Sequence, residues 1–163
     1  MVVGGAPLSP ELQALIKAAA NVTLIQGYGA TETLGAVLCM DFHDLSFGRV
    51  GAPLSGIKLK LIDWEEGGYR TTDKPNPRGE IVIGGTKVAM GYFQMEQLTK
   101  EVFYEEDGTR WFITGDIGEV FPDGTVKIVD RRSDLIKLQN GEFIALGKVI
   151  KDIWKNDWLT ILF

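Results

Sequence analysis

An eight-residue segment near the amino terminus combines glycines with side chains that can do chemistry. It runs from Gln26 to Thr33 and reads Gln-Gly-Tyr-Gly-Ala-Thr-Glu-Thr. The ring of Tyr28 can lie on a flat base, the Thr31 hydroxyl can reach phosphate oxygens, and Glu32 can hold Mg²⁺ as a hard oxygen ligand. A second interpretation stays open on these residues alone, because a glycine turn followed by a solvated glutamate has the same sequence.

A short strand is predicted to position this segment. Residues 22–25 are apolar and partly β-branched, and the glycines that follow predict a loop at the carboxyl end of that strand. Val2 and Val3 predict another strand, which enters the loop formed by residues 4–7. Because a strand follows Met1 directly, we expect the chain to begin inside a larger fold.

A helix is predicted between these two strands, over residues 9–20. Ser9 can cap its first turn, and Pro10 suits the first helical position because its missing N–H has no partner there. Apolar residues recur at helical spacing and predict one apolar face, made of Leu12, Leu15, Ile16 and Ala19.

The rest of the chain predicts mostly strands and turns. The predicted strands are residues 57–61, 79–83, 111–114, 118–121 and 125–129, followed by a hairpin of 134–138 with 142–144. Residues 94–104 predict a second helix, and the pattern becomes helix-like again after Lys148. This order predicts an α+β arrangement, or part of a larger α/β protein.

Composition excludes several classes of function. The 163 residues carry a net charge of −5, and no basic stripe interleaved with aromatic residues runs through the chain, so no nucleic-acid partner is expected. The sequence has no apolar run of about 18 residues and no basic segment followed by an apolar cleavable one. By its own signals the chain is expected to be neither secreted nor membrane-spanning.

Four motifs stand in an order that resembles the adenylate-forming enzymes, the superfamily that includes the acyl-CoA synthetases. They are Gly4-Gly5-Ala6-Pro7, the segment of residues 26–33, residues 78–84 (Arg-Gly-Glu-Ile-Val-Ile-Gly) and Thr114-Gly115-Asp116. Within that superfamily, residues 107–132 are similar to the signature of fatty acyl-CoA synthetases. Residues 64–69 and 73–80 look most like the animal long-chain fatty-acid–CoA ligases of types 3 and 4. The resemblance runs from about residue 2 to residue 149.

The resemblance implies the fold and the reaction. The chain would be an α+β fragment of the larger α/β adenylate-forming fold, with mostly strands and a few helices. The family joins a fatty acid to ATP to give acyl-AMP and pyrophosphate, and then the thiol of CoA displaces AMP to leave a thioester. ATP and Mg²⁺ would be the cofactors, CoA the cosubstrate and a long-chain fatty acid the substrate.

The resemblance also implies which residues surround the base of the nucleotide. Gly5, Ala6 and Pro7 would border the adenine, and Gly27 and Tyr28 would lie against it, with the Tyr28 ring stacked on the base. For the first three residues, a simple strand-to-helix turn is the open alternative.

Five further roles follow from the same matches. Thr31 would contact phosphate and Glu32 would bind Mg²⁺, both in the catalytic step. Asp116 would accept hydrogen bonds from both ribose hydroxyls, although a turn cap is the alternative. Arg131 would reach the ribose or a phosphate, and Lys137 would serve the thioester-forming step, unless it lies on the polar face of an alternating strand.

Three parts of the chain are distinguished by the resemblance. Residues 1–130 would be the C-terminal part of the large AMP-binding domain, residues 131–149 the hinge and the start of the small domain, and residues 150–163 a divergent tail. Ser133 matches the hinge position, where relatives usually carry lysine or aspartate. Arg132 is equally explained as a nucleotide contact or as a solvated charge.

The family's phosphate-binding loop and the lysine that assists adenylation have no match in this chain, so we expect the isolated chain to be inactive. Two alternatives remain open at this stage: a noncatalytic nucleotide-binding or interaction module, and an adenylating enzyme for another carboxylic acid. The parent protein is expected at the cytosolic face of the endoplasmic reticulum or of other intracellular membranes.

Overall fold

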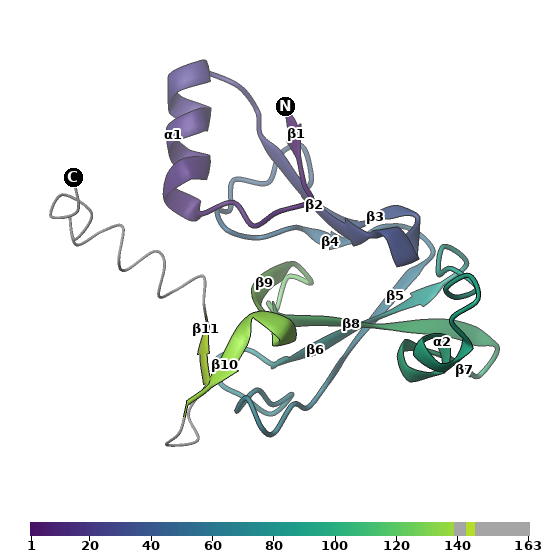
Figure 1. The fold of residues 1–163 in the computed structure, drawn as a ribbon. Helices are drawn as coiled ribbons and strands as arrows, with labels where there is room; N and C mark the ends of the chain where they lie inside the picture. Colours follow the sequence, from purple (N-terminus) through teal and green to yellow (C-terminus); the bar gives the residue numbers. More distant parts are fainter. Residues whose placement is uncertain (139–142, 146–163) are drawn as a thin grey trace, which may run out of the picture.

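The computed structural model describes residues 1–138 and 143–145, and these form two main sheets and a small hairpin (Figure 1). The first sheet has the order β1 (Val2–Val3), β2 (Ile25–Ala30), β3 (Gly35–Cys39) and β4 (Ala52–Pro53). The second has the order β5 (Ile57–Ile62), β6 (Arg78–Gly85), β8 (Thr109–Val120) and β7 (Phe103–Glu106), with β9 (Val126–Arg131) also paired to β8. The hairpin pairs β10 (Leu135–Lys137) with β11 (Phe143–Ala145).

Four helical segments complete the described part of the chain: α1 (Pro10–Ala20), α2 (Glu96–Val102) and the single 3₁₀ turns η1 (Thr31–Thr33) and η2 (Arg132–Asp134). The predicted α+β class with mostly strands is therefore confirmed. Neither α1 nor α2, within the described residues, is long and apolar enough to cross a membrane. The turn of the predicted second hairpin and the helix-like pattern after Lys148 lie outside the described residues.

The glycine-rich segment is itself a strand, which corrects the prediction of a strand at residues 22–25 followed by a loop. Strand β2 begins at Ile25 and continues through both glycines to Ala30. It pairs in parallel with β1, Val3 opposite Gln26, and antiparallel with β3. Backbone pairing needs no side chain, so the glycines that predicted a break are accommodated within the sheet.

Gly29 is required by a close approach of the backbone. A Cβ atom at this position would lie 2.0 Å from the carbonyl oxygen of Gly35, far inside contact distance. We expect Gly29→Ala to lower the free energy of unfolding by about 3 kcal/mol, at the upper end of the cost of overpacking. Urea denaturation of the purified chain measures this. Gly27→Ala is the matched control on the same strand, because its Cβ would lie an ordinary 3.5 Å from its nearest neighbour.

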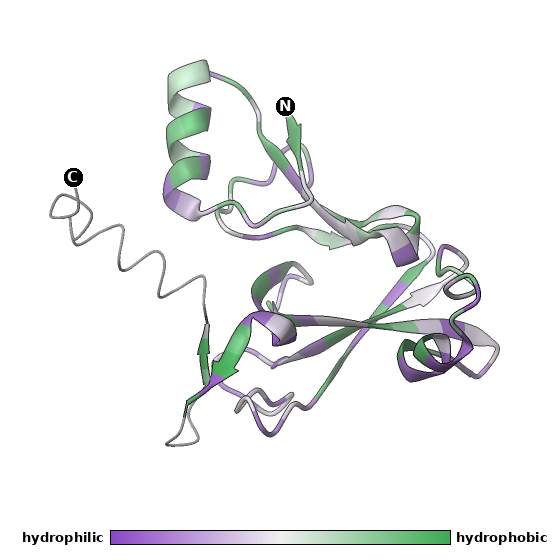
Figure 2. Cartoon of the chain, in the orientation of Figure 1, coloured by the Kyte–Doolittle hydropathy of each residue, from purple (hydrophilic) through white to green (hydrophobic). Residues whose placement is uncertain are grey.

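Helix α1 is confirmed with its cap, and its predicted apolar face is largely exposed in this structure. Ser9 accepts a hydrogen bond from the Leu12 N–H at 3.2 Å, as an N-cap does. Leu12 and Leu15 are nevertheless 46% and 61% exposed, and much of the helix is coloured hydrophobic in Figure 2. The fully buried residue is Gln13, whose side-chain oxygen accepts a 2.8 Å hydrogen bond from the Gln26 amide. Polar contacts therefore hold α1 against β2.

Strand β8 is one continuous strand, although residues 111–114 and 118–121 predicted two. Ile113 of β8 pairs with Val82 of β6, and Ile117 of β8 pairs with Glu80 of β6. Three residues of β8 therefore lie opposite one residue of β6. Gly115 has a φ of +74°, which a glycine adopts without strain and which lets the strand bulge. The Thr114–Asp116 motif is that bulge, and Asp116 at its end pairs with Arg131 of β9.

Predicted helix 94–104 is shorter in the structure, because α2 ends at Val102 and Phe103 and Tyr104 begin β7. The predicted strands at 57–61, 79–83 and 125–129 are confirmed as β5, β6 and β9, with bounds that differ by a few residues.

One apolar core joins the two main sheets. Its buried members come from β3, from the β6–β8–β9 region and from the segments between, namely Val37, Leu38, Ile81, Ile83, Val88, Phe103, Phe112 and Val126. Because β3 carries β2 with it, this shared core fixes β2 of the first sheet relative to β8 of the second. The candidate site lies where these two strands meet.

Candidate nucleotide site

Tyr28 and Asp116 are joined by a hydrogen bond between the two sheets. The Tyr28 hydroxyl donates to Oδ2 of Asp116 at 2.6 Å, although the residues are 88 positions apart in the sequence. Asp116 is only 4% exposed. Burial, and then the Asp116 carboxylate, raises the pKa of Tyr28 well above its ordinary value, so the hydroxyl stays a donor.

Arg131 holds the same carboxylate from β9. The register of β8 and β9 places Arg131 opposite Asp116. Its Nε donates to Oδ1 at 2.7 Å, and the ion pair raises the pKa of Arg131. A carboxylate has about four acceptor positions, so Asp116 can still accept a hydrogen bond from a ligand. The Arg131 side chain is 58% exposed, which leaves part of its donor fork facing solvent.

The loop after β1 lies beside these residues. A Cβ on Gly4 would approach the carbonyl oxygen of Gly27 to 3.0 Å, so the backbones of the loop and of β2 run close together. Gly5 has a φ of +85°, and Ala6 and Pro7 are exposed. The predicted base-binding residues therefore follow β1 next to the β2 residue that precedes Tyr28. Ligands of α/β proteins usually bind outside the carboxyl ends of parallel strands.

The two threonines of the segment have different surroundings. Thr33 is buried, and its hydroxyl accepts from the Ala30 N–H at 3.0 Å and donates to the Gly35 carbonyl at 2.9 Å. These bonds fix the η1 turn. Thr31 is exposed on the same turn, where a phosphate oxygen could reach it.

Glu32 is held by a residue that sequence reasoning did not identify. The Tyr92 hydroxyl donates to Oε1 of Glu32 at 2.7 Å, and the Ala89 N–H donates to the Glu32 carbonyl at 2.8 Å. Burial and the Glu32 carboxylate raise the pKa of Tyr92 to about 12, so its hydroxyl remains protonated. The two residues are 60 positions apart, and no spacing or motif in the sequence connects them.

Lys137 is not brought to this cluster. Its Nζ pairs with the Glu66 carboxylate at 3.1 Å, and both side chains are exposed. Its role in thioester formation stays a prediction. Arg132, which the sequence left open, is not simply solvated, because it donates to both oxygens of the buried Glu80 at 3.1 and 2.9 Å.

Glu32 offers one carboxylate to the predicted Mg²⁺ ion. Within residues 1–138 and 143–145, no group of three or more His, Cys, Asp or Glu side chains is arranged to hold a metal ion. Mg²⁺ is commonly held by one or two carboxylates together with substrate phosphates and water. Glu32, with one oxygen outside the Tyr92 hydrogen bond, provides one such carboxylate.

Comparison with known proteins shows the family to which the chain belongs. Residues 1–93 match the family of AMP-binding enzymes. The chain is 52% identical over 150 residues to long chain acyl-CoA synthetase 8 of Arabidopsis thaliana, covering 91% of this chain and 21% of that protein. It is 44% identical over 142 residues to fatty acyl-CoA synthetase A of Dictyostelium discoideum, covering 87% of this chain and 21% of that protein.

A solved structure is similar over the same region. The AMP-bound adenylation domain of carboxylic acid reductase from Segniliparus rugosus has a TM-score of 0.72 and 40% sequence identity, covering 91% of this chain and 22% of that one. The chain therefore belongs to the family of AMP-binding enzymes and has the adenylate-forming fold. It spans about a fifth of the length of the curated relatives it matches.

Proposed function

We propose that this chain forms one wall of the nucleotide site of an ATP-dependent long-chain fatty-acid–CoA ligase. The observation that carries the proposal is the cluster in which Asp116 accepts hydrogen bonds from Tyr28 and Arg131. It unites two of the four family motifs around one buried carboxylate. Relatives named as long chain and fatty acyl-CoA synthetases support the substrate class.

In the first half-reaction, the fatty-acid carboxylate attacks the α-phosphate of ATP, the bond between the α- and β-phosphates breaks, and pyrophosphate leaves as acyl-AMP forms. Asp116 binds the ribose hydroxyls, and the bond from Tyr28 to Asp116 fixes the tyrosine ring so that adenine stacks on its face. Arg131 stabilises negative charge on the ribose-phosphate side through its planar donors. Thr31 donates to a phosphate oxygen.

Glu32 would hold Mg²⁺ at the phosphates, where the ion neutralises charge that develops on the oxygens during transfer. Glu32 itself sits on a turn whose backbone is fixed by Thr33, so the backbone that carries this carboxylate is in place before the nucleotide arrives. Preorganised ligands of this kind contribute to catalysis because they need no rearrangement at the moment of reaction.

The second half-reaction joins the acyl group to CoA, and Lys137 is the residue of this chain proposed to serve it. The parent protein is proposed to act at the cytosolic face of intracellular membranes. Residues 131–149 are proposed as the hinge and the start of the small domain. Of these, residues 139–142 and 146–149 lie outside the described part, as does the tail of residues 150–163.

Fatty-acid-dependent exchange of pyrophosphate into ATP tests the proposal. A full-length synthetase that contains this segment is expected to show exchange with long-chain fatty acids and to release AMP when CoA is added. Residues 1–163 alone are expected to show neither, since they span about a fifth of the related enzymes. Exchange with aromatic or short acids but not with long-chain acids would instead support an adenylating enzyme for another acid. Absence of exchange with every acid would favour a noncatalytic module.

A further inference from the structure

The contact between Tyr92 and Glu32 assigns a task to a residue outside the family motifs described above. Tyr92 follows β6 on a loop, and its hydroxyl bonds one carboxylate oxygen of Glu32, Oε1. The second carboxylate oxygen of Glu32 takes no part in this hydrogen bond. We propose that Tyr92 is a positioning residue that orients the Glu32 carboxylate toward Mg²⁺ and the ATP phosphates. This inference rests on the proposed function of the site.

The loop that carries Tyr92 is fixed at several points. The Ala89 N–H donates to the Glu32 carbonyl, and the Ala89 carbonyl in turn accepts a 2.8 Å hydrogen bond from Arg110 Nε. A second Arg110 nitrogen donates to the carbonyl of Met90. The loop therefore bridges β8, which carries Arg110, and the η1 turn, which carries Glu32.

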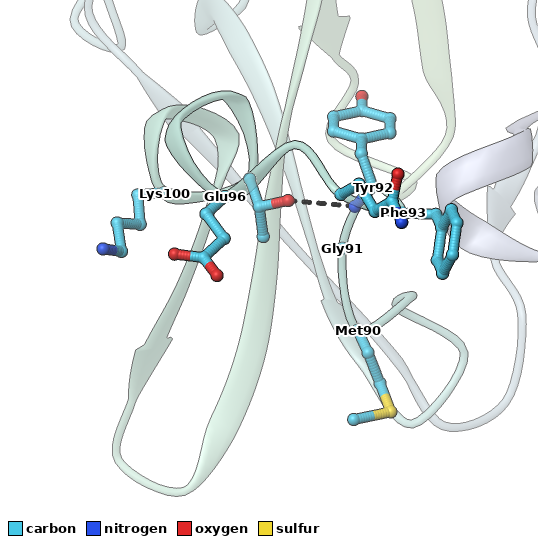
Figure 3. Close-up of a pocket in the computed structure, with 8 residues that line it drawn as sticks. Met90, Gly91, Tyr92, Phe93, Glu96 and Lys100 are labelled. Atoms are coloured by element: carbon cyan, nitrogen blue, oxygen red, sulfur yellow. Dashed lines mark hydrogen bonds between the residues drawn. The ribbon is translucent and has the colours of Figure 1, made fainter.

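Both the backbone and the ring of Tyr92 are held by neighbouring residues. Its N–H donates to the Thr99 hydroxyl at 2.9 Å, the bond drawn in Figure 3, and its ring packs edge-on against Phe103 with centroids 5.5 Å apart. The ring points away from Met90, which lies at the other end of the drawn loop (Figure 3). A groove of about 480 Å³ lies along this loop and α2. The hydroxyl is thus presented to Glu32 by a constrained ring.

A fixed hydroxyl matters because Glu32 lies on a single 3₁₀ turn and is only half-buried. A long side chain in that position can adopt several rotamers, and few of them aim an oxygen at a bound nucleotide. Groups that hydrogen-bond a metal-binding carboxylate typically change metal affinity or activity by 10–100-fold when removed. Tyr92 has the geometry of such a group.

Replacing Tyr92 with phenylalanine isolates the hydroxyl, because the ring and its packing on Phe103 are retained. In a full-length synthetase that contains this segment, Y92F is expected to weaken metal binding roughly 10-fold. Two measurements report metal binding. In the first, Mn²⁺ is titrated in the presence of a nonhydrolysable ATP analogue, and electron paramagnetic resonance gives the concentration of free Mn²⁺. The second is the Mg²⁺ concentration that gives half-maximal activity. The KM for the fatty acid is expected to be unchanged.

Tyr69→Phe is the matched control. Its hydroxyl also donates to a carboxylate, that of Asp130 at 2.8 Å, and its pKa is likewise raised to about 12. The Tyr69→Phe substitution therefore removes the same kind of hydrogen bond, but away from the Glu32 turn. It is expected to leave metal binding unchanged. An equal loss in Y69F and Y92F would mean a general structural effect and would overturn the inference, as would unchanged metal binding in Y92F.

Glu32→Gln separates this inference from the proposed function. If E32Q does not weaken metal binding, the assignment of Glu32 fails, and the role of Tyr92 fails with it. If E32Q weakens metal binding and Y92F does not, only the role of Tyr92 fails. The expected result is that Y92F has little further effect in the E32Q background, because Tyr92 acts through that carboxylate. A full additional loss in the double variant would overturn the inference.

Discussion

Replacing Glu32 with alanine in a full-length synthetase that contains this segment is expected to lower kcat by roughly 100-fold. A metal ion at the reacting phosphates contributes several kcal/mol to the stabilisation of the transition state, and loss of one carboxylate ligand removes about 2–3 kcal/mol of it. The KM for ATP is expected to change much less, since the proposed base and ribose contacts of Tyr28 and Asp116 remain. Steady-state rates of AMP release at saturating Mg²⁺ measure both parameters.

Glu101→Ala provides the control for this experiment. Glu101 is exposed on α2, where it accepts a 3.2 Å hydrogen bond from Gln97, and its removal is expected to leave kcat unchanged. Because Tyr92→Phe only releases the carboxylate, it is expected to have a smaller effect than Glu32→Ala. An E32A enzyme with normal kcat would refute the catalytic assignment of Glu32 and leave the η1 turn with a structural role.

Local patterns in the sequence predicted the elements that depend mainly on neighbouring residues in the chain. Strand β5 alternates apolar residues with lysines, and helix α1 begins at a Ser-Pro pair, so both were predicted close to their observed bounds. Pairing and burial were not predictable in the same way. The face of α1 against β2 depends on Gln13, a polar residue whose burial is explained only by its bonds to the amide of Gln26 and to the N–H of Gly48.

The candidate site shows the same division. Tyr28 and Asp116 were each singled out by motifs, but their contact depends on a bulge in β8 that is visible only once the register with β6 is known. Glycines at 27 and 29 predicted a loop, whereas both lie inside strand β2, where the close approach of Gly35 requires a glycine at position 29. Tyr92 belongs to no motif quoted above. Its proposed role rests on the fold, which places its hydroxyl 2.7 Å from Oε1 of Glu32.

Asp116→Ala is expected to raise the KM for ATP at least about 10-fold with a smaller change in kcat. Hydrogen bonds to a charged acceptor contribute roughly 1.5–3 kcal/mol, and about 1.4 kcal/mol corresponds to a factor of ten. The ribose is bound in both the ground state and the transition state, so the loss falls mainly on KM. Steady-state kinetics with varied ATP, run beside Glu32→Ala, separates anchoring of the nucleotide from chemistry.

The same substitution has a structural consequence that identifies its cause. It leaves the half-buried Tyr28 hydroxyl without its Asp116 partner. A fully buried unsatisfied polar group costs about 1–3 kcal/mol of folding free energy, so a loss of about 1 kcal/mol is expected for this partly exposed one. Adding Tyr28→Phe removes that hydroxyl, so the double variant is expected to regain stability in urea denaturation while the KM for ATP stays high. If the KM recovered together with stability, the effect of Asp116→Ala would come from misfolding, and the carboxylate would not be a ribose ligand. If Asp116→Ala left the ATP kinetics unchanged in a folded protein, the Thr114–Asp116 bulge would be a structural feature alone.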